Sequence, residues 1–412
     1  MRNVAILTFR VLFSALLAKG VLCEIIQVYT ENEFDQTVVD EVNEEDIQHE
    51  ILSALGLPEF EKQNWTRYPL NQAASEFILQ MYDKLNEEDA YQRRGPGSRK
   101  RRWADYEDID NLISPLDELK LHESDNVMTF MISSIPKFLQ PCARKRPNHV
   151  LWFNTSQIPG NVSLANAQLK IYKHRIPEMG KIYEIMLYSI SIHGRNKFRL
   201  SYLTSTETRS SYEGWLELNV TKMLAKWHLK PASNKGLYVE VNYWKNIWKE
   251  EVEIANAGLA GMTSVDSEKP FMVGYFRNKE GASPLQIGAI PYVRRKRRLS
   301  KSELYQLTRN QRCEKMRFSV DFKKLNWMNW IVAPDKFESS YCGGDCSFPL
   351  NGLDATNHAI IQTLVHLKNP KIPKPCCVPT ELASIMLIYR VSQDLVNMKK
   401  YNNMAVKSCG CL

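Results

Sequence analysis

The last hundred residues of the chain hold seven of its nine cysteines, and this density constrains the fold more than any other feature of the sequence. It indicates either a disulfide framework or a metal site. Zinc sites usually take cysteines paired about two to four residues apart. This block has one adjacent pair and one Cys-x-Cys pair instead, so we predict disulfides and no metal. The seven are Cys313, Cys342, Cys346, Cys376, Cys377, Cys409 and Cys411.

Two short segments of this block, CGGDC at 342–346 and CGC at 409–411, can be joined by two disulfides into a small closed ring. A third disulfide could pass through the ring where side-chain bulk is minimal, and the two glycines of CGGDC provide that room. Cys313 and one member of the adjacent pair would form this third bond. One cysteine is then left over, and an odd cysteine in a secreted fragment indicates a bond to a second chain. We therefore predict a disulfide-linked dimer.

The chain opens with a segment typical of a secretory signal peptide. Arg2 and Arg10 supply positive charge, residues 11–18 form an unbroken apolar stretch, and small residues follow. The stretch is shorter than the ~18 residues that cross a bilayer, which disfavours a membrane anchor. We predict that residues 1–23 are removed and that the protein is secreted. Asn-x-Ser/Thr sequons, the acceptors of N-linked glycans, agree with an extracellular location; they begin at Asn64, Asn154, Asn161 and Asn219.

Two basic clusters divide the rest of the chain. The first ends at Arg102 and the second at Arg298, and in a secreted chain Arg-x-Lys/Arg-Arg is the pattern cut by furin-like convertases. The alternatives for such clusters are a nuclear signal, a heparin patch or a solvated loop. We predict cleavage after both arginines, which gives a pro-region at 24–298 and a C-terminal region at 299–412. The C-terminal region has 15 Lys and Arg against 9 Asp and Glu.

Hydrophobic periodicity predicts a mostly β fold with some α-helix. In the pro-region, apolar residues recur at helical spacing over 74–85, which indicates an amphipathic helix. Residues 125–280 alternate in short stretches and predict an antiparallel β-sandwich. The C-terminal region is predicted to form paired β-strand fingers around the cysteines, plus one helix that begins at Thr356-Asn357. A helix in so small a fragment has little core of its own, so we expect it to pack against a second protomer.

Composition excludes several classes. Hydrophobic residues make up 44% of the chain, too many for wholly disordered protein. The net charge of +8 is mild for 412 residues and does not indicate a nucleic-acid partner. No nucleophile–base motif, phosphate-binding loop or metal signature is evident. We therefore predict neither an enzyme nor a cofactor.

The C-terminal region closely resembles the transforming growth factor β superfamily. The matching motifs are VDFKKLNWMNWIVAP, YCGGDCSFPL, ATNHAIIQTLVHL, PKPCCVPTELASI and SCGCL. The pro-region is similar in SEFILQMYDKL, GWLELNVTKMLAKW and PFMVGYF. Within the superfamily the motifs are most like the bone morphogenetic proteins, and among these the insect ligands. The resemblance implies a cystine-knot growth factor, released from its pro-region, that acts as a morphogen.

The resemblance also implies how individual residues act. It pairs Cys313 with Cys377, Cys342 with Cys409 and Cys346 with Cys411, and leaves Cys376 to link protomers. It implies activation of type I and type II serine/threonine kinase receptors and of Smad signalling, in developmental patterning along the dorsal–ventral axis. The implied type I surface has Trp327, Trp330, Phe348, Pro349 and the loop 351–354, completed by Tyr401 and Met404 of the other protomer. The implied type II surface has Ala333, Pro334, Met386, Ile388 and Met398.

Several features depart from the family pattern, two of them at finger residues. Met386 stands where a small hydroxyl residue is usual, and Arg390-Val391 replaces an apolar–acidic pair. Altered surfaces leave open a heterodimer with a related ligand besides a homodimer. The alternative function is a secreted cystine-knot antagonist, or a matrix-bound modulator of such ligands. The basic C-terminal region makes heparan sulfate, collagen and extracellular antagonists further candidate partners.

Overall fold

The computed structural model describes most of the chain from residue 72 onward. Asn64, Arg102, Arg298, the predicted signal peptide and loop residues 351–353 lie outside the described residues, so the expectations for them stay predictions. Two short strands, β1 (Thr37–Val39) and β11 (Arg294–Lys296), pair antiparallel, and β11 is part of the second basic cluster. The other described residues are 72–94, 112–144, 146–177, 180–193, 197–245, 248–279, 312–325, 327–350 and 354–412.

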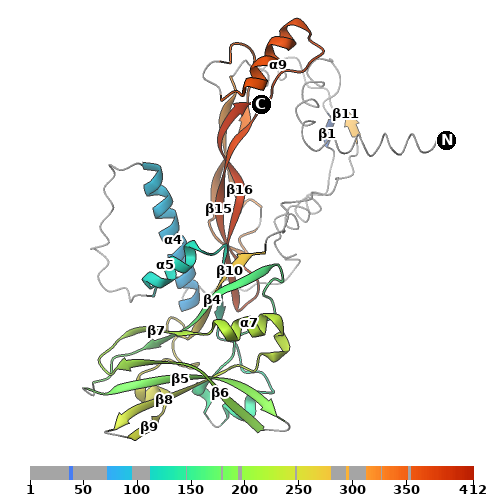
Figure 1. The fold of residues 1–412 in the computed structure, drawn as a ribbon. Coiled ribbons are helices and arrows are strands. Elements are labelled where there is room, and N and C mark those ends of the chain that lie inside the picture. The colour runs from blue at the N-terminus through green and yellow to red at the C-terminus, as the bar shows by residue number, and fades with distance from the viewer. Residues whose placement is uncertain are drawn as a thin grey trace, which may run out of the picture.

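Within these residues, one antiparallel sheet of seven strands runs through both the pro-region and the C-terminal region. β16 of the C-terminal region pairs with β2 of the pro-region, and this pairing joins the two parts (Figure 1). The order across the sheet is β13 (Ile331–Ala333), β15 (Cys377–Arg390), β16 (Leu395–Cys411), β2 (Asn126–Met131), β10 (Phe271–Asn278), β4 (Val162–Lys173) and β7 (Gly214–Asn219).

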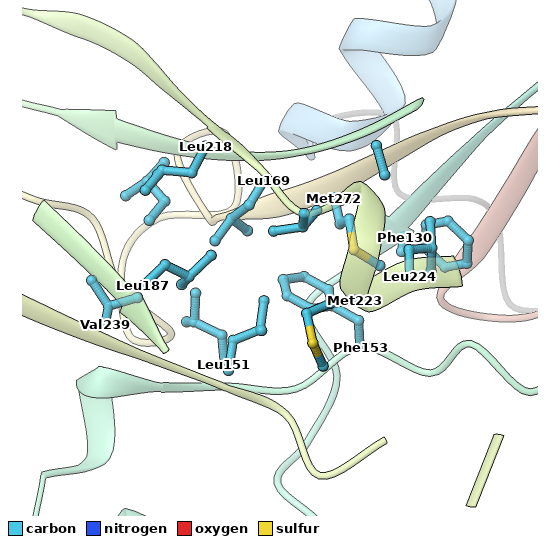
Figure 2. Close-up of a cluster of buried hydrophobic side chains, with 14 of the residues drawn as sticks. Phe130, Leu151, Phe153, Leu169, Leu187, Leu218, Met223, Leu224, Val239 and Met272 are labelled. Atoms are coloured by element: carbon cyan, nitrogen blue, oxygen red, sulfur yellow. The ribbon is translucent and has the colours of Figure 1, made fainter. Parts of the chain in front are cut away.

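A second antiparallel sheet of the described residues packs against the pro-region half of the first. Apolar side chains from the two sheets and from α7 (Thr221–Leu229) fill the space between them (Figure 2). Among the labelled residues, Leu169 and Leu218 come from the first sheet and Leu187 and Val239 from the second. This is the predicted β-sandwich. The second sheet has β3 (Val150–Leu151), β8 (Leu237–Lys245), β5 (Ile182–His193) and β6 (Lys197–Arg209), with β9 (Trp248–Val252) paired to β8.

The opposite face of the seven-stranded sheet is covered by helices α4 (Ala73–Arg94) and α5 (Pro115–His122). Strand side chains alternate between the faces, as the period of a β-strand requires. In β2, Met128 and Phe130 enter the sandwich core, whereas Val127 and Met131 contact the helices. β2 is therefore buried on both faces, and its sequence NVMTFM shows little polar alternation.

The C-terminal region forms two long fingers and a helix. β15 and β16 make one finger, and β12 (Glu314–Asp321) pairs with β14 (Lys336–Gly343) in the other. The helix α9 (Asn357–Lys368) lies at the far end of β15 and β16 from the sandwich (Figure 1). The Thr356 hydroxyl caps it by accepting a hydrogen bond from the Ala359 amide at 3.2 Å. The predicted helix start at Thr356-Asn357 is thus confirmed, as is the mostly β fold.

Candidate functional site

Three disulfides of the described C-terminal residues lie close together. They join Cys313 to Cys377, Cys342 to Cys409 and Cys346 to Cys411, the pairs that the family resemblance implies. The sulfurs of Cys313, Cys346 and Cys411 lie within 4.8 Å of one another, but they belong to two of these disulfides and leave no thiolate for a metal. Two glycines beside these disulfides stand where a side chain would be strained or would clash. Gly344 has φ of +111°, and a side chain on Gly410 would meet the Asp354 carbonyl oxygen at 2.2 Å.

The tip of the finger made by β15 and β16 pairs with a strand of the pro-region. Residues 395–399 pair with 126–130 of β2, so the pro-region extends the finger by one strand. The Met131 amide donates to the Asp394 carbonyl oxygen at 2.8 Å, and the Ser133 hydroxyl donates to the Asp394 carboxylate at 2.8 Å. Leu395 is fully buried within the sandwich core of the pro-region. The fingertip and the pro-region therefore share one hydrophobic core.

The pro-region helix α4 covers one face of the fingers. We call this the covered face, made of Ala333, Met386, Ile388, Val396 and Met398. It packs in one cluster with Phe77, Ile78 and Met81 of α4, all of which are fully buried. Ile388 and Met398 are also fully buried, and Ala333 and Met386 are partly buried. Four of the residues in the implied type II surface thus lie together beneath α4, and Pro334 follows directly in the chain.

The opposite face of the fingers carries an aromatic cluster. Trp327 and Trp330 lie with their ring centroids 5.5 Å apart, and Phe322 stacks on Trp327 at 6.0 Å. Both tryptophans are largely buried, at 7% and 5% exposure. We call this the tryptophan cluster: Phe322, Trp327, Trp330, Ile331, Leu387, Tyr389 and Tyr401.

One expectation about the implied type I surface needs correction. We expected Tyr401 and Met404 to reach the tryptophans from a second protomer, yet both pack in the tryptophan cluster of their own chain. The reason is the pairing of β15 with β16, which places Tyr401 opposite Ile385 on the tryptophan side. Phe348 and Pro349 instead lie exposed next to Leu350, which packs against the cystine knot. The structure therefore does not bring these two residues to the tryptophans of the same chain.

Two family models match the sequence over these same parts. The model described as TGF-beta propeptide matches residues 29–275, which contain α4, α5 and the sandwich. The model described as Transforming growth factor beta like domain matches residues 312–411, which contain the knot, the fingers and α9. The chain belongs to the transforming growth factor β family. Members of this family are signalling ligands rather than enzymes.

Curated members of the family align over most of the chain. Protein 60A of Drosophila melanogaster is 35% identical and covers 93% of this chain and 91% of its own. Protein screw of Drosophila melanogaster is 35% identical and covers 83% of this chain and 85% of its own. Human Bone morphogenetic protein 8A is 31% identical and covers 89% of each. The chain is therefore a growth factor of the bone morphogenetic protein type, as its motifs predicted.

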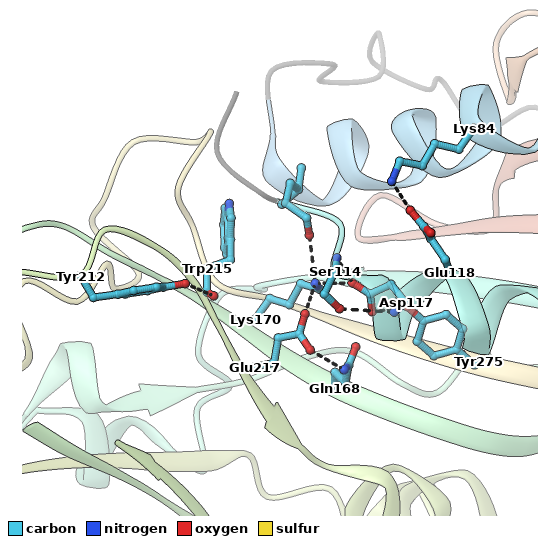
Figure 3. Close-up of polar contacts among 11 residues, drawn as sticks. Lys84, Ser114, Asp117, Glu118, Gln168, Lys170, Tyr212, Trp215, Glu217 and Tyr275 are labelled. Atoms are coloured by element: carbon cyan, nitrogen blue, oxygen red, sulfur yellow. Dashed lines mark hydrogen bonds and ion pairs between the residues drawn. The ribbon is translucent and has the colours of Figure 1, made fainter. Parts of the chain in front are cut away.

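The pro-region of this growth factor holds a buried polar network beneath α4 (Figure 3). Lys170 of β4 donates to the carboxylates of Asp117 at 2.7 Å and Glu217 at 2.8 Å. Tyr275 donates to Asp117 at 2.7 Å. Burial alone would raise the pKa of Asp117, but Lys170 and the hydrogen bonds from Ser114 and Tyr275 hold that pKa below its usual value. Burial, with Asp117 next to it, raises the pKa of Tyr275.

Three predicted glycosylation sites lie in described parts of the pro-region. Asn161 and Asn219 are exposed, and Asn154 is half-buried. The Asn219 side-chain oxygen accepts from the Thr221 amide at 3.0 Å, which fixes a turn at the start of α7. The Asn154 side-chain oxygen accepts from the Ser156 hydroxyl at 2.7 Å. Glycans at these positions stay predictions. No helix of the described residues is long and apolar enough to span a membrane.

Sequence reasoning missed the residues that connect the two parts. It predicted paired strands in the C-terminal region but did not expect Leu395 inside the pro-region core, and it gave β2 no partner in the C-terminal region. It also missed Lys170, since a lysine in an alternating strand is usually exposed. One signal was available. The run NVMTFM is apolar on both strand faces, which indicates a strand covered on both sides.

Proposed function

We propose that this growth factor is secreted as a precursor and cut after Arg298 by a furin-like convertase, with a second cut after Arg102. The released C-terminal region forms a disulfide-linked dimer through Cys376, as a homodimer or with a related ligand. It activates type I and type II receptor kinases and Smad signalling in developmental patterning. The family membership and the two basic sites support this proposal.

The proposal about receptor binding rests on one observation, which is that the pro-region already covers the covered face. Its apolar side chains are packed under α4 and bordered by β2 in the described structure. A face this apolar, once the pro-region leaves, is typical of a protein-binding surface. The pro-region and a type II receptor would then compete for the same residues. We infer that the pro-region restrains receptor binding until it dissociates.

A second surface supports the dimer. α9 exposes a row of large apolar side chains in the single chain, including Ile361 at 61% and Leu367 at 62%. Exposed apolar rows on a helix usually mark contact with another molecule. A second protomer would cover α9 and bring its own tryptophan cluster near Phe348 and Pro349. In this arrangement each type I surface takes residues from both protomers.

The proposal is tested by comparing the free dimer of 299–412 with the dimer still bound to its pro-region. Binding to immobilised type I and type II receptor ectodomains and Smad phosphorylation in cells are measured for both. We expect the free dimer to bind type II ectodomain at least about tenfold more tightly, a difference of about 1.4 kcal/mol. Equal binding by the two forms would show that the covered face is not the type II surface.

Two variants of the free dimer separate the two receptor surfaces. Met386→Asp puts a charge in the covered face, and we expect it to weaken type II binding while type I binding is kept. Phe348→Ala removes a side chain that is 61% exposed and distant from the covered face. We expect the reverse pattern from it. If both variants weaken both ectodomains equally, the assignment of the two surfaces is wrong.

A further inference from the structure

Lys170 lies at the point where α4, the segment that leads into α5, and the seven-stranded sheet meet. Its side chain is fully buried in the middle of β4. In the register of the sheet it stands opposite Phe271 of β10 and Glu217 of β7. A buried lysine is rare unless its charge is paired, so its contacts indicate what it holds in place.

The ammonium group of Lys170 has three protons, and each has an acceptor. The acceptors are the Leu112 carbonyl oxygen at 2.9 Å, the Asp117 carboxylate at 2.7 Å and the Glu217 carboxylate at 2.8 Å (Figure 3). Two of these acceptors belong to the segment 112–117. Lys170 therefore fixes that segment and the start of α5 to the sheet.

The same ammonium group also contacts α4. It lies 4.9 Å from the centroid of the Phe77 ring, a cation–π distance, and the Phe77 ring packs on Phe271 at 5.5 Å. α5 supports α4 from the side through an ion pair between Glu118 and Lys84. Leu112, Ile113 and Leu121 share the hydrophobic cluster of α4 and the covered face. Loosening the segment at Lys170 would thus loosen α4 as well.

We infer that Lys170 is a positioning residue that sets how firmly α4 is held over the covered face. Direct contact with Phe77 and indirect support through 112–122 both depend on its charge. The functional consequence, receptor access to the covered face, rests on the function proposed above. The position of α4 itself does not, so the two can be tested separately.

The chain offers a matched control three residues away. Lys173 is also a fully buried lysine of β4, but it donates to the carbonyl oxygens of His174, Ser210 and Tyr212. None of these belongs to α4 or α5. Lys173→Met therefore removes a buried ammonium from the same strand without touching the helices, and Lys170→Met removes the one that holds them.

Hydrogen exchange on the secreted full chain gives the first readout. In Lys170→Met we expect faster exchange of the amides of 112–122 by roughly 10- to 100-fold, the range for a lost hydrogen bond to a charged group. For α4 we expect roughly 3- to 30-fold, the range of a partly buried cation–π contact. Amides of β5 and β8 should not change. Equal exchange of α4 in Lys170→Met and Lys173→Met overturns the inference.

Lys170→Met leaves the buried Asp117 and the partly buried Glu217 without their cation, and the pro-region could fail to fold. The triple variant Lys170→Met, Asp117→Asn, Glu217→Gln removes every charge of the group, and neutral replacement of a buried ion pair is often tolerated. We expect it to be secreted and to show the same faster exchange of α4. Wild-type protection of α4 in the secreted triple variant also overturns the inference.

The second readout is binding of type II receptor ectodomain to the pro-region complex. Faster exchange of α4 together with tighter ectodomain binding supports both the inference and the proposed function. Faster exchange with unchanged ectodomain binding supports the role of Lys170 but contradicts the assignment of the covered face. The two readouts therefore distinguish a failure of the role of Lys170 from a failure of the proposed function.

Discussion

Two amphipathic helices of this growth factor differ in what covers their apolar side. α4 of the pro-region buries Phe77, Ile78 and Met81 completely against its own chain. α9 of the C-terminal region buries Ala359 and Thr363 but leaves Ile361 and Leu367 more than half exposed. Both helices show apolar residues at helical spacing in the sequence. The spacing predicts a helix with an apolar side and does not identify its partner.

The difference has a structural reason. α4 lies on a sheet that has strands of both parts of the chain, so it finds an apolar surface within the same molecule. α9 lies at the far end of the fingers, away from the sandwich (Figure 1). A single precursor chain can therefore bury the apolar side of α4, whereas the apolar side of α9 needs a second protomer to cover it. Cleavage and dissociation of the pro-region would remove α4 from the fingers and leave the contact between α9 and the second protomer intact.

The largest expected effect comes from α9. The double substitution Ile361→Asp, Leu364→Asp places charges where we expect the protomer contact. Each apolar side chain buried there contributes about 1.5–3 kcal/mol, and a symmetric dimer loses every one twice. We expect no reductant-sensitive dimer on gel electrophoresis of the secreted product.

The control for α9 is Lys368→Ala, an exposed residue at the end of the same helix. It should leave the dimer yield unchanged, because its side chain adds little apolar contact area. A normal yield of dimer from the double variant would mean that α9 packs elsewhere. The comparison with α4 would then fail.

The next largest effect is expected at α4. Phe77→Ala removes a fully buried ring that contacts Phe271 and Lys170, and such truncations cost about 3–5 kcal/mol. We expect the pro-region complex to bind type II ectodomain nearly as well as the free dimer does. Leu229→Ala, at a residue 81% exposed on α7, serves as the control and should change binding little. Unchanged binding in Phe77→Ala argues against α4 as the restraint.

Local features of the fold were predictable from sequence, because local rules govern them. The helix start at Thr356 follows from its capping side chain, and the positive φ of Gly344 agrees with the glycines of CGGDC. Pairing of residues 126–130 with 395–399 could not be predicted, since it joins segments far apart in the chain and both have apolar residues on each face. The own-chain position of Tyr401 depends on the register of β15 and β16, which bulges shift.

A smaller effect concerns the pH range over which the network beneath α4 holds. Among the described residues, Asp117 interacts with Lys170, Tyr275 and Lys120, and Glu217 shares the ammonium group of Lys170. The pKa of Asp117 is held below its ordinary 3.8, with burial opposing this and Lys170 the largest lowering cause. A carboxyl whose folded pKa is depressed stabilises the fold above its unfolded pKa, and this stability is lost as pH falls through the folded pKa.

We therefore expect the stability difference between the wild type and Asp117→Asn to stay constant from pH 7 to about pH 5 and to shrink below about pH 4. Thermal unfolding of the pro-region complex across this range measures it. Tyr188→Phe, at a tyrosine of β5 outside the network, should show no such trend. A difference that disappears between pH 7 and pH 5 would contradict an ionised Asp117 in the folded state.

The smallest expected effect lies at the fingertip, beside the contacts of α4. Ser133→Ala removes the hydrogen bond to Asp394, which is 2.8 Å long and links the pro-region to the finger. Asp394 is partly exposed and water can replace the lost donor, so we expect a cost of about 1 kcal/mol. That is about a fivefold weaker affinity of the cleaved pro-region for the dimer, measurable by surface plasmon resonance. Ser191→Ala removes a similar bond inside the pro-region and should leave that affinity unchanged. Equal affinities for the two variants would mean that the strand pairing and Leu395, rather than this side-chain contact, hold the fingertip.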